Sequence, residues 1–225
     1  MLANNLANAG TSGFKGDQEF YSLYTSEAAE PDALGDKATL PVIDRPWTDF
    51  SQGLLQTTKN PLDLALSGKG FFVVNGPSGP LYTRNGSFQL SAAGVLTAAD
   101  GLPVRAQGGG TITVDPAMPV QVASDGSVEQ NGAVVAQLDL VTFSNPAVLS
   151  KQGSAYFLNT DATVKPQPAL NVEVHQGSVE ASNIKTPEAA VHLVSVMRQF
   201  EMLHKAINIS VDMNKKAEDV ARVGS

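Results

Sequence analysis

The middle of the chain alternates between short apolar runs and turn dipeptides of Asn, Asp and Gly. Asn-Gly and Asp-Gly pairs supply the positive φ angles that tight hairpin turns need. They recur at 75–76, 85–86, 100–101, 125–126 and 131–132, and a Ser-Gly pair at 78–79 is a further turn candidate. The β-prone runs between them are 62–66, 71–74, 81–84, 87–90, 111–114, 120–122 and 134–143. Short strands punctuated in this way predict a mainly antiparallel β domain of sandwich or barrel type over residues 41–180.

The C-terminal segment changes to a helical period. Thr186, Pro187 and Glu188 form a helix start, with a hydroxyl N-cap, a proline in the first turn and an acid near the positive end of the helix dipole. Apolar residues then recur in steps of three and four and form one stripe: Leu193, Val196, Met197, Phe200, Leu203, Ile207 and Val211. The pattern predicts a helix of about 35 residues, roughly 50 Å long.

A helix of this length extends beyond what the β domain alone can cover. Two interpretations are open: the helix docks on its own domain, or it is a coiled-coil element whose mate lies elsewhere in the chain or in another subunit. The length favours the second. A partial mate is present at the N-terminus, where Leu2 and Leu6 have helical spacing and Gly10 and Gly13 then end the helix.

These patterns divide the chain into three parts. We expect a helical remnant and an extended linker over residues 1–40, the β domain over 41–180, and a coiled-coil-type helix over 181–225 that pairs with the N-terminal segment. The expected assembly interface consists of Leu2, Leu6 and the apolar stripe of the C-terminal helix.

Composition narrows the function classes. The chain has 225 residues with a net charge of −7, and this acidity argues against nucleic-acid binding. Cys is absent, which removes disulfides, thiol nucleophiles and Cys-ligated metal sites. No apolar run reaches the 18–20 or so residues of a membrane-spanning helix, and the N-terminus lacks the features of a cleaved secretory signal. The chain therefore either stays in the cytoplasm or is exported without a cleaved signal.

No catalytic, cofactor or metal site emerges from the residue patterns. His192 and His204 are twelve positions apart on the predicted helix, too far to share a metal on one face. Two further hypotheses are open. A glycan-binding module would use Trp47 and Tyr82 as a platform, and a glycan hydrolase would use an acid pair such as Asp63 and Asp139.

Motifs in one fixed order along nearly the whole chain resemble the flagellar rod and hook family, the axial proteins of the bacterial flagellum. The matching residues include Asn4, Asn5, Leu6 and Asn8, then Gly13 and Phe14, then Gly70 and Phe71, then Tyr82, Thr83, Arg84, Gly86 and Phe88, and finally Ser182 and Asn183. The run from Tyr82 to Phe88 is the most specific of them. No single motif carries the resemblance; their joint order does.

The resemblance implies a structural protein without enzymatic activity or cofactors. Its partners would be copies of itself and other rod proteins, joined through terminal helices that pair and transmit torque. It would leave the cell through the flagellar type III export apparatus and lie in the periplasmic rod. The compact β domain resembles the proximal rod type more than the distal rod or hook types. One departure concerns the start, because the family has about 20 further residues before the Asn-rich motif; we expect a misassigned start or a truncation.

Overall fold

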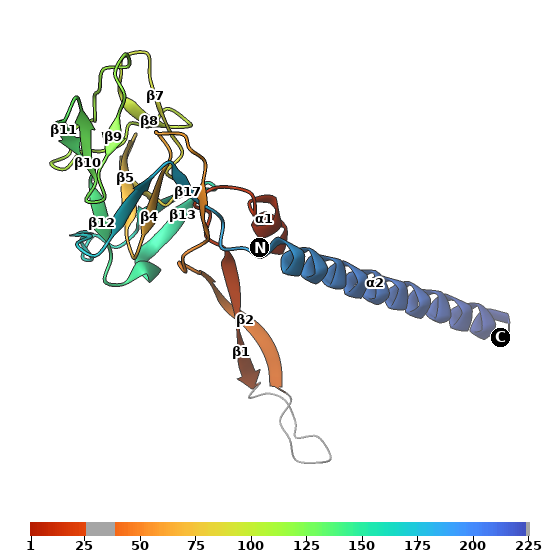
Figure 1. The fold of residues 1–225 in the computed structure, drawn as a ribbon. Coiled ribbons are helices and arrows are strands. Elements are labelled where there is room, and N and C mark those ends of the chain that lie inside the picture. Colours follow the sequence, from red (N-terminus) through yellow and green to blue (C-terminus); the bar gives the residue numbers. More distant parts are fainter. Residues whose placement is uncertain (26–38, 224–225) are drawn as a thin grey trace.

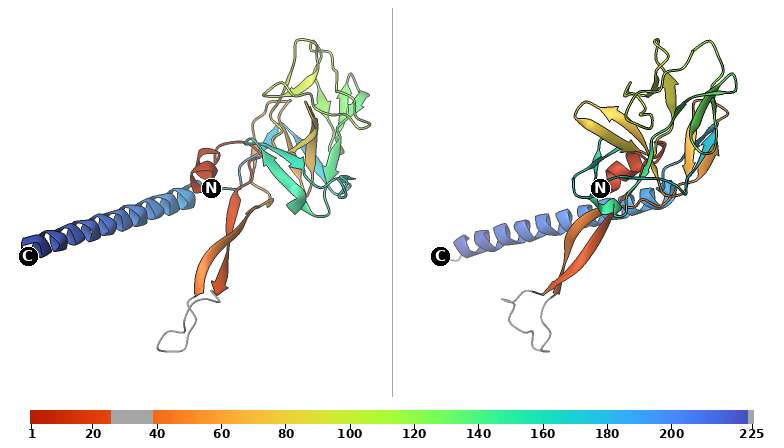
Figure 2. Two further views of the ribbon diagram at one scale, coloured as in Figure 1. Left: turned by 180° about the vertical axis from the view of Figure 1, so that it is seen from behind. Right: turned by 90° about the vertical axis from the view of Figure 1, so that its left-hand side faces the viewer.

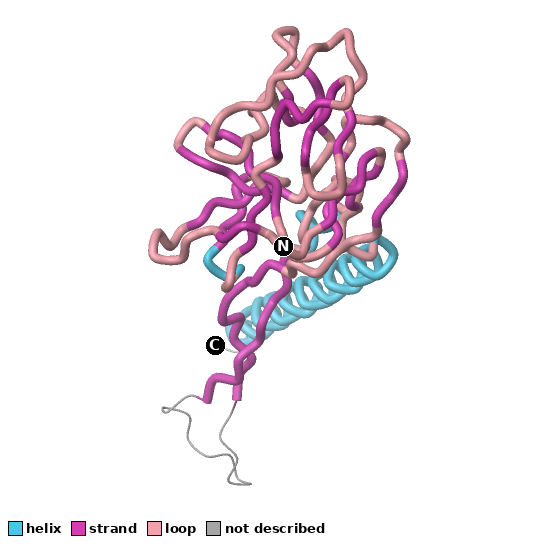
Figure 3. The backbone as a smooth tube through the Cα atoms, turned by 60° about the vertical axis from the view of Figure 1, so that its left-hand side comes forward, coloured by secondary structure: helices cyan, strands magenta, loops and turns pink. Residues whose placement is uncertain are grey.

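The computed structural model describes residues 1–25 and 39–223, and it has three parts. A β domain carries most of the chain, and a two-stranded hairpin and one long helix extend from it in different directions (Figures 1 and 2). The long helix runs outside the β domain (Figure 3). The predicted combination of an antiparallel β domain, a long C-terminal helix and a short N-terminal helix is confirmed.

The centre of the β domain is a six-stranded sheet with the order β13-β14-β6-β5-β12-β15. Neighbouring strands in it are antiparallel. Its strands are β5 (Phe71–Gly76), β6 (Gly79–Thr83), β12 (Leu140–Thr142), β13 (Leu149–Gln152), β14 (Tyr156–Asn159) and β15 (Gln167–Pro168). A short 3-10 helix, η1 (Pro146–Val148), leads into β13.

Smaller antiparallel sheets surround this centre. One has the order β11-β10-β9, and the others are the pairs β16-β4, β17-β3 and β7-β8. The strands concerned are β3 (Leu55–Thr57), β4 (Leu64–Ser67), β7 (Phe88–Leu90), β8 (Leu96–Ala98), β9 (Gln121–Val122), β10 (Ser127–Gln130), β11 (Ala133–Gln137), β16 (Glu173–Gln176) and β17 (Ser178–Glu180). Since β16 and β17 pair with β4 and β3, the end of the β domain returns to its beginning.

Apolar residues fill both sides of the central sheet. Phe72 and Val74 of β5 face one core and Phe71 and Val73 face the other, because successive side chains of a strand point to opposite faces. In the first core the Phe72 ring meets the Phe88 ring edge-on, with 5.2 Å between centroids. A continuous apolar run is therefore the pattern of a strand that is covered on both faces.

The turn predictions hold where the hairpin is local. Asn131 and Gly132 join β10 to β11, and both have positive φ (53° and 74°), as a tight two-residue turn requires. The prediction of a turn at 75–76 is wrong by two residues. Asn75 and Gly76 pair across the hairpin with Pro80 and Gly79, so the turn itself is 77–78.

Two strand predictions are also wrong. The run 111–114 forms only isolated bridges, Thr111 with Arg105 and Thr113 with Val95. The run 134–143 is two strands, β11 and β12, in different sheets. The chain leaves the β11-β10-β9 sheet at Leu138. Its N–H donates to Gly126 O at 2.9 Å, and its side chain is buried in the first core, which also contains Phe72.

Part of the segment expected to be an extended linker forms the first strand of a hairpin instead, and most of the second strand lies in the segment expected to belong to the β domain. Strands β1 (Asp17–Thr25) and β2 (Thr39–Thr48) pair antiparallel, with a bulge between Glu19 and Tyr21. The rest of that predicted linker, 26–38, lies outside the described residues. The backbone hydrogen bonds of each strand are thus supplied by the other, far along the chain, which short-range patterns do not reveal.

Two helices flank these strands. Helix α1 (Leu2–Ala7) is short, and helix α2 spans Thr186–Val223. The predicted cap at Thr186 is one residue late. Thr186 is already the first helical residue, and the carbonyl of Lys185 accepts the first hydrogen bond, from Ala189 N–H at 3.0 Å.

Candidate functional site

The apolar stripe predicted for α2 lies in solvent along most of its length. Phe200 is 70% exposed, and the exposed members of the stripe are Val196, Met197, Phe200, Leu203, Ile207 and Val211. Leu193, near the start of the helix, is half-buried. With 38 residues, α2 is about 57 Å long, and its apolar surface has no cover within the described chain after its first turns.

The cover at the start of α2 comes from α1. Of the described elements, α1 packs most closely on α2, and it lies beside the start of α2 in Figure 2. Leu2 and Leu6 are half-buried, as are Ala189, Ala190 and Leu193. The predicted interface residues Leu2 and Leu6 therefore meet only the beginning of the stripe.

A second apolar stripe on α2 escaped the sequence analysis. Exposed apolar residues also occupy the side roughly opposite Phe200 at about 100° per residue: Val191, Val194, Met202, Ile209 and Met213. We call this the opposite stripe. Its members are three, eight, seven and four positions apart, so two steps pass over a whole turn without an apolar member, and the pattern is less evident than that of the predicted stripe. A helix that exposes apolar residues on two sides has room for two partners.

The junction between α1, the hairpin and the β domain is built on a fully buried segment, 13–16. Gly13 N–H donates to Glu180 O at 2.7 Å. Gly13 has φ of 70°, and a Cβ there would lie 2.2 Å from Asn85 N. Only glycine fits this approach, which explains why a Gly-Phe pair at this position and an Arg-Asn-Gly run at 84–86 occur together.

A cluster of buried charges lies at the centre of the junction. Lys15 Nζ is 2.5 Å from Glu180 Oε1, and Arg84 Nη1 is 3.1 Å from Glu180 Oε2. Lys15 and Glu180 are 0% exposed. Lys15 also donates to Ser51 O at 2.6 Å, and Arg84 donates to the carbonyls of Leu66 and Gly68. Removing one partner of such a buried pair leaves an uncompensated charge and costs about 3–5 kcal/mol.

Burial sets the electrostatics of this cluster. It lowers the pKa of the Lys15 ammonium and the pKa of the Arg84 guanidinium, because both lose the hydration of their charge. The Glu180 carboxylate opposes both shifts, and the Arg84 charge lowers the pKa of Lys15 further. Lys15 and Arg84 thus share the Glu180 carboxylate in a buried site, and the Asp49 charge also raises the pKa of Lys15.

Two asparagines clamp the backbone on either side of the cluster. Asn5 Nδ2 donates to Asp17 O at 2.7 Å, and its Oδ1 accepts from Asp17 N–H at 3.0 Å. Asn183 Oδ1 accepts from Gly16 N–H at 2.8 Å, and its Nδ2 donates to Asp49 O at 2.8 Å. Both side chains therefore tie a terminal segment to the hairpin base.

The other motif residues also serve the fold. Thr83 Oγ1 donates to Ala155 O at 2.6 Å, Asn8 Nδ2 donates to Asn4 O at 2.9 Å, and Ser182 Oγ accepts from Ile184 N–H at 3.1 Å. The remaining motif residues in the β domain and the segment before it are buried: Phe14, Gly70, Phe71, Tyr82, Gly86 and Phe88. The motifs hold the junction and the cores, whereas α2 carries an extended series of exposed apolar residues.

The residues proposed for glycan binding and for glycan hydrolysis do not come together in the described structure. Tyr82 is buried in the second core against Phe143, at 4.8 Å between ring centroids, so it forms no platform with Trp47. Asp63 accepts hydrogen bonds from Thr58, Asn60 and Ser87. Asp139 pairs with Arg105 at 3.3 Å, and its pKa is raised because it is partly buried, an effect that Arg105 opposes. The two carboxylates are held by different residues and share no partner.

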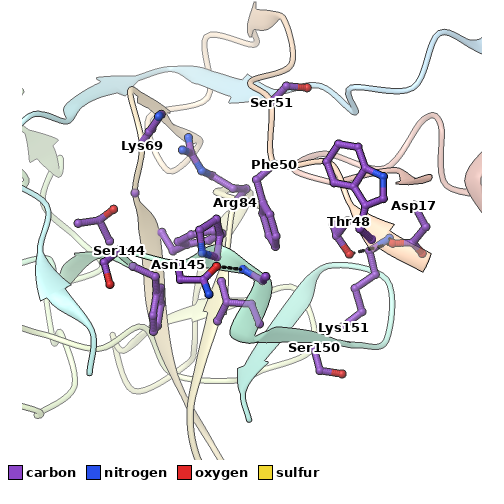
Figure 4. Close-up of a pocket in the computed structure, with 18 of the residues that line it drawn as sticks. Asp17, Thr48, Phe50, Ser51, Lys69, Arg84, Ser144, Asn145, Ser150 and Lys151 are labelled. Atoms are coloured by element: carbon purple, nitrogen blue, oxygen red, sulfur yellow. Dashed lines mark hydrogen bonds and ion pairs between the residues drawn. The ribbon is translucent and has the colours of Figure 1, made fainter. Parts of the chain in front are cut away.

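A pocket of about 1030 Å³ lies between the hairpin base and the β domain. Figure 4 shows Lys69 and Arg84 on one side of Phe50, and Thr48 and Asp17 on the other. Trp47 is 48% exposed at its rim. Lys151 Nζ, 2.8 Å from Asp17 Oδ1 and 4.3 Å from the centroid of the Phe14 ring, ties the hairpin base to β13.

Helix length gives one further finding. Among residues 1–25 and 39–223, no helix combines the length and the apolar character that crossing a membrane requires.

Comparison with known proteins agrees with this architecture. Residues 65–136 match the family description "Flagellar hook protein FlgE/F/G D1 domain", and residues 175–220 match "Flagellar basal body rod FlgEFG protein C-terminal". The first match lies in the β domain, and the second runs from the junction along α2.

Full-length relatives are also similar. The chain is 35% identical to the flagellar basal-body rod protein FlgF of Caulobacter vibrioides, over 100% of this chain and 91% of that protein. It is 33% identical to FlgF of Salmonella typhimurium, over 96% of this chain and 88% of that protein. It is 32% identical to the rod protein FlgG of Buchnera aphidicola subsp. Schizaphis graminum, over 96% and 91%. Matches of this extent, in the order of a β domain followed by a terminal helix, show that the chain belongs to the flagellar basal-body rod protein family.

Proposed function

We propose that the two apolar stripes of α2, with Leu2 and Leu6 of α1, form the contacts between subunits of the rod. The chain is a structural axial subunit of the flagellar basal body, in agreement with its relatives, which are named flagellar basal-body rod proteins. The observation that carries the proposal is the exposure of the stripe: Phe200, Leu203 and Ile207 are each at least 60% exposed.

Energetics supports this use of α2. Burying one large apolar side chain contributes about 1.5–3 kcal/mol. The stripe presents such residues over several turns, beginning where α1 ends its contact. A second copy or another rod protein that continued the cover of α1 would bury all of them at once, which is enough for a stable axial contact.

The test is assembly of rods carrying acidic substitutions on α2. Phe200→Asp with Ile207→Asp should abolish rod assembly, because a carboxylate cannot be buried in an apolar contact without a partner. The β domain should remain folded, since neither residue touches its cores. Ser210→Asp, on the side of α2 between the two stripes, is the matched control and should assemble. Intact rods in the double mutant would refute the proposal.

Further features of the function are part of the same proposal. We infer that the chain is not an enzyme, that it is a proximal rod subunit, and that it transmits torque in the periplasm after export by the flagellar type III apparatus. The compact β domain and the family resemblance support these points. Export is tested by its loss in a strain without the export gate. Proximal position is tested by finding the protein in rods that lack distal rod and hook proteins.

A further inference from the structure

We propose that Glu180 is a positioning residue that sets the direction in which α2 leaves the β domain. Segment 13–16 contributes to this positioning, because it brings Lys15 to the Glu180 carboxylate. The consequence for assembly rests on the proposed function, since a rod contact needs the stripes of α2 presented at a defined angle.

Glu180 joins four separate parts of the chain. Its carboxylate accepts from Lys15 Nζ at 2.5 Å, from Gly53 N–H at 2.9 Å and from Arg84 Nη1 at 3.1 Å. Its backbone carbonyl accepts from Gly13 N–H at 2.7 Å. These partners come from the segment entering the hairpin, the segment leaving it, and the end of β6. Glu180 itself is the last residue of β17.

The segments around Glu180 are in close contact. A Cβ on Gly53 would lie 2.0 Å from Ala181 O, and a Cβ on Gly16 would lie 2.2 Å from Ile184 Cδ1. Ala181 N–H donates to Leu54 O at 2.8 Å. The connection of five residues between Glu180 and Thr186 is therefore held from both sides, and small shifts at the cluster move the base of α2.

The three charges are unequal in importance. Without Lys15, Glu180 keeps Arg84 as its counter-ion. Without the Glu180 carboxylate, two buried cations lose the anion that they share, and like charges repel strongly where solvent does not screen them. Asp49 then remains as the carboxylate that acts on Lys15. Loss of Glu180 should therefore open the junction more than loss of Lys15. The exposed pair of Lys185 with Glu188, at 3.2 Å, differs because solvent screens both of its charges.

Distance measurement between spin labels tests the proposal. The chain has no cysteine, so Gln137→Cys in β11 and Lys205→Cys in α2, both exposed, report the direction of α2 in the full chain. The chain that carries only these two labelled cysteines should give a single narrow peak in the distribution of distances between the labels. Glu180→Gln should lose that peak and give a broad distribution, and Lys15→Met should broaden it less. Glu188→Gln, which removes an exposed carboxylate at the base of the same helix, should keep the narrow peak.

Folding and assembly are measured on the same samples. Near-ultraviolet circular dichroism reports whether the cores of the β domain are packed. A narrow, unshifted peak in folded Lys15→Met and folded Glu180→Gln would overturn the proposal. If Glu180→Gln does not fold, Lys15→Met decides, because its Glu180–Arg84 pair stays neutral. Failure of the proposed function has a different signature: Phe200→Asp with Ile207→Asp would then assemble, while its distance peak stayed narrow.

Discussion

The β domain and helix α2 use the same apolar residue types in opposite ways. Phe72 in β5 is 0% exposed, whereas Phe200 in α2 is 70% exposed. Strand β5 of the central sheet has a core on each face, and its backbone hydrogen bonds join it both to β6, the next strand, and to β12, which lies far along the chain. A helix satisfies its own hydrogen bonds, so it forms with its side chains still uncovered.

The residues that stabilise the folded chain and the residues available for contacts with other subunits lie in different parts of the molecule. The β domain contains the contacts that fold it, and the junction around Glu180 connects that domain to its extensions. Helix α2 carries apolar side chains that are exposed in the single chain. A change in the β domain should therefore act on a single chain, and a change on α2 should act on the assembled rod.

The largest expected difference is in amide exchange of the dilute, unassembled chain. Amides of β5 should exchange only through global unfolding, which costs about 5–15 kcal/mol for a typical domain. Amides of α2 after Leu193 should exchange far faster, because local fraying uncovers few apolar contacts. Hydrogen exchange followed by mass spectrometry measures both at once. Strong protection of the amides of 194–213 in a demonstrated monomer would contradict the claim that this part of α2 is uncovered in the single chain.

Truncation of one phenylalanine in each region compares their contributions to the free energy of unfolding. Phe72→Ala should lower the free energy of unfolding by about 3–5 kcal/mol, since it leaves a cavity in the first core. Phe200→Ala should change that free energy by less than about 0.5 kcal/mol, because the ring is exposed. Urea denaturation of the monomer measures both values. Similar losses in the two variants would show that α2 is covered within one chain.

Close backbone approach inside the β domain gives an intermediate effect. A Cβ on Gly86 would lie 1.7 Å from Leu64 O, across the hydrogen bond of Leu64 N–H to Gly86 O at 2.9 Å. Gly86→Ala should therefore cost about 1–3 kcal/mol through forced backbone shifts. Gly110→Ala is the control, as a Cβ there has no atom within 4 Å. Thermal unfolding should separate the two variants.

The smallest effect concerns one tyrosine that links β14 to the turn after β8. Tyr156 Oη donates to Asp100 Oδ1 at 2.8 Å. Burial, followed by this hydrogen bond and the Asp100 charge, raises the pKa of Tyr156 well above its usual value. The unfolded chain then loses this proton first, so stability should fall as the pH rises above about 10.

Asp100→Asn tests this link. It should lower the pKa of Tyr156 toward, but not to, its ordinary value, because burial remains. It should cost about 0.5–1.5 kcal/mol at neutral pH. Tyrosinate absorbance of parent and variant, titrated in parallel, measures the shift. An unchanged titration curve would contradict the role of Asp100.

Sequence patterns predict the secondary structure correctly where a few neighbouring residues determine it. Asn131 and Gly132 carry their own turn, and the period of the C-terminal segment carries its own helix. The resemblance in motif order identified the family, which the comparisons confirm. The same approach missed the pairing of β1 with β2 and the separation of 134–143 into two strands, because both depend on partners far along the chain.

The β-rich middle, the long terminal helix and an apolar stripe with too little cover follow from the amino-acid sequence alone, since turn chemistry and periodicity act over a few residues. That Lys15 and Glu180, 165 positions apart, share a hydrogen bond, and that Tyr82 is buried rather than available as a platform, becomes evident only from the folded chain. Burial and charge pairing depend on which segments meet, and that is settled by the packing of the whole chain.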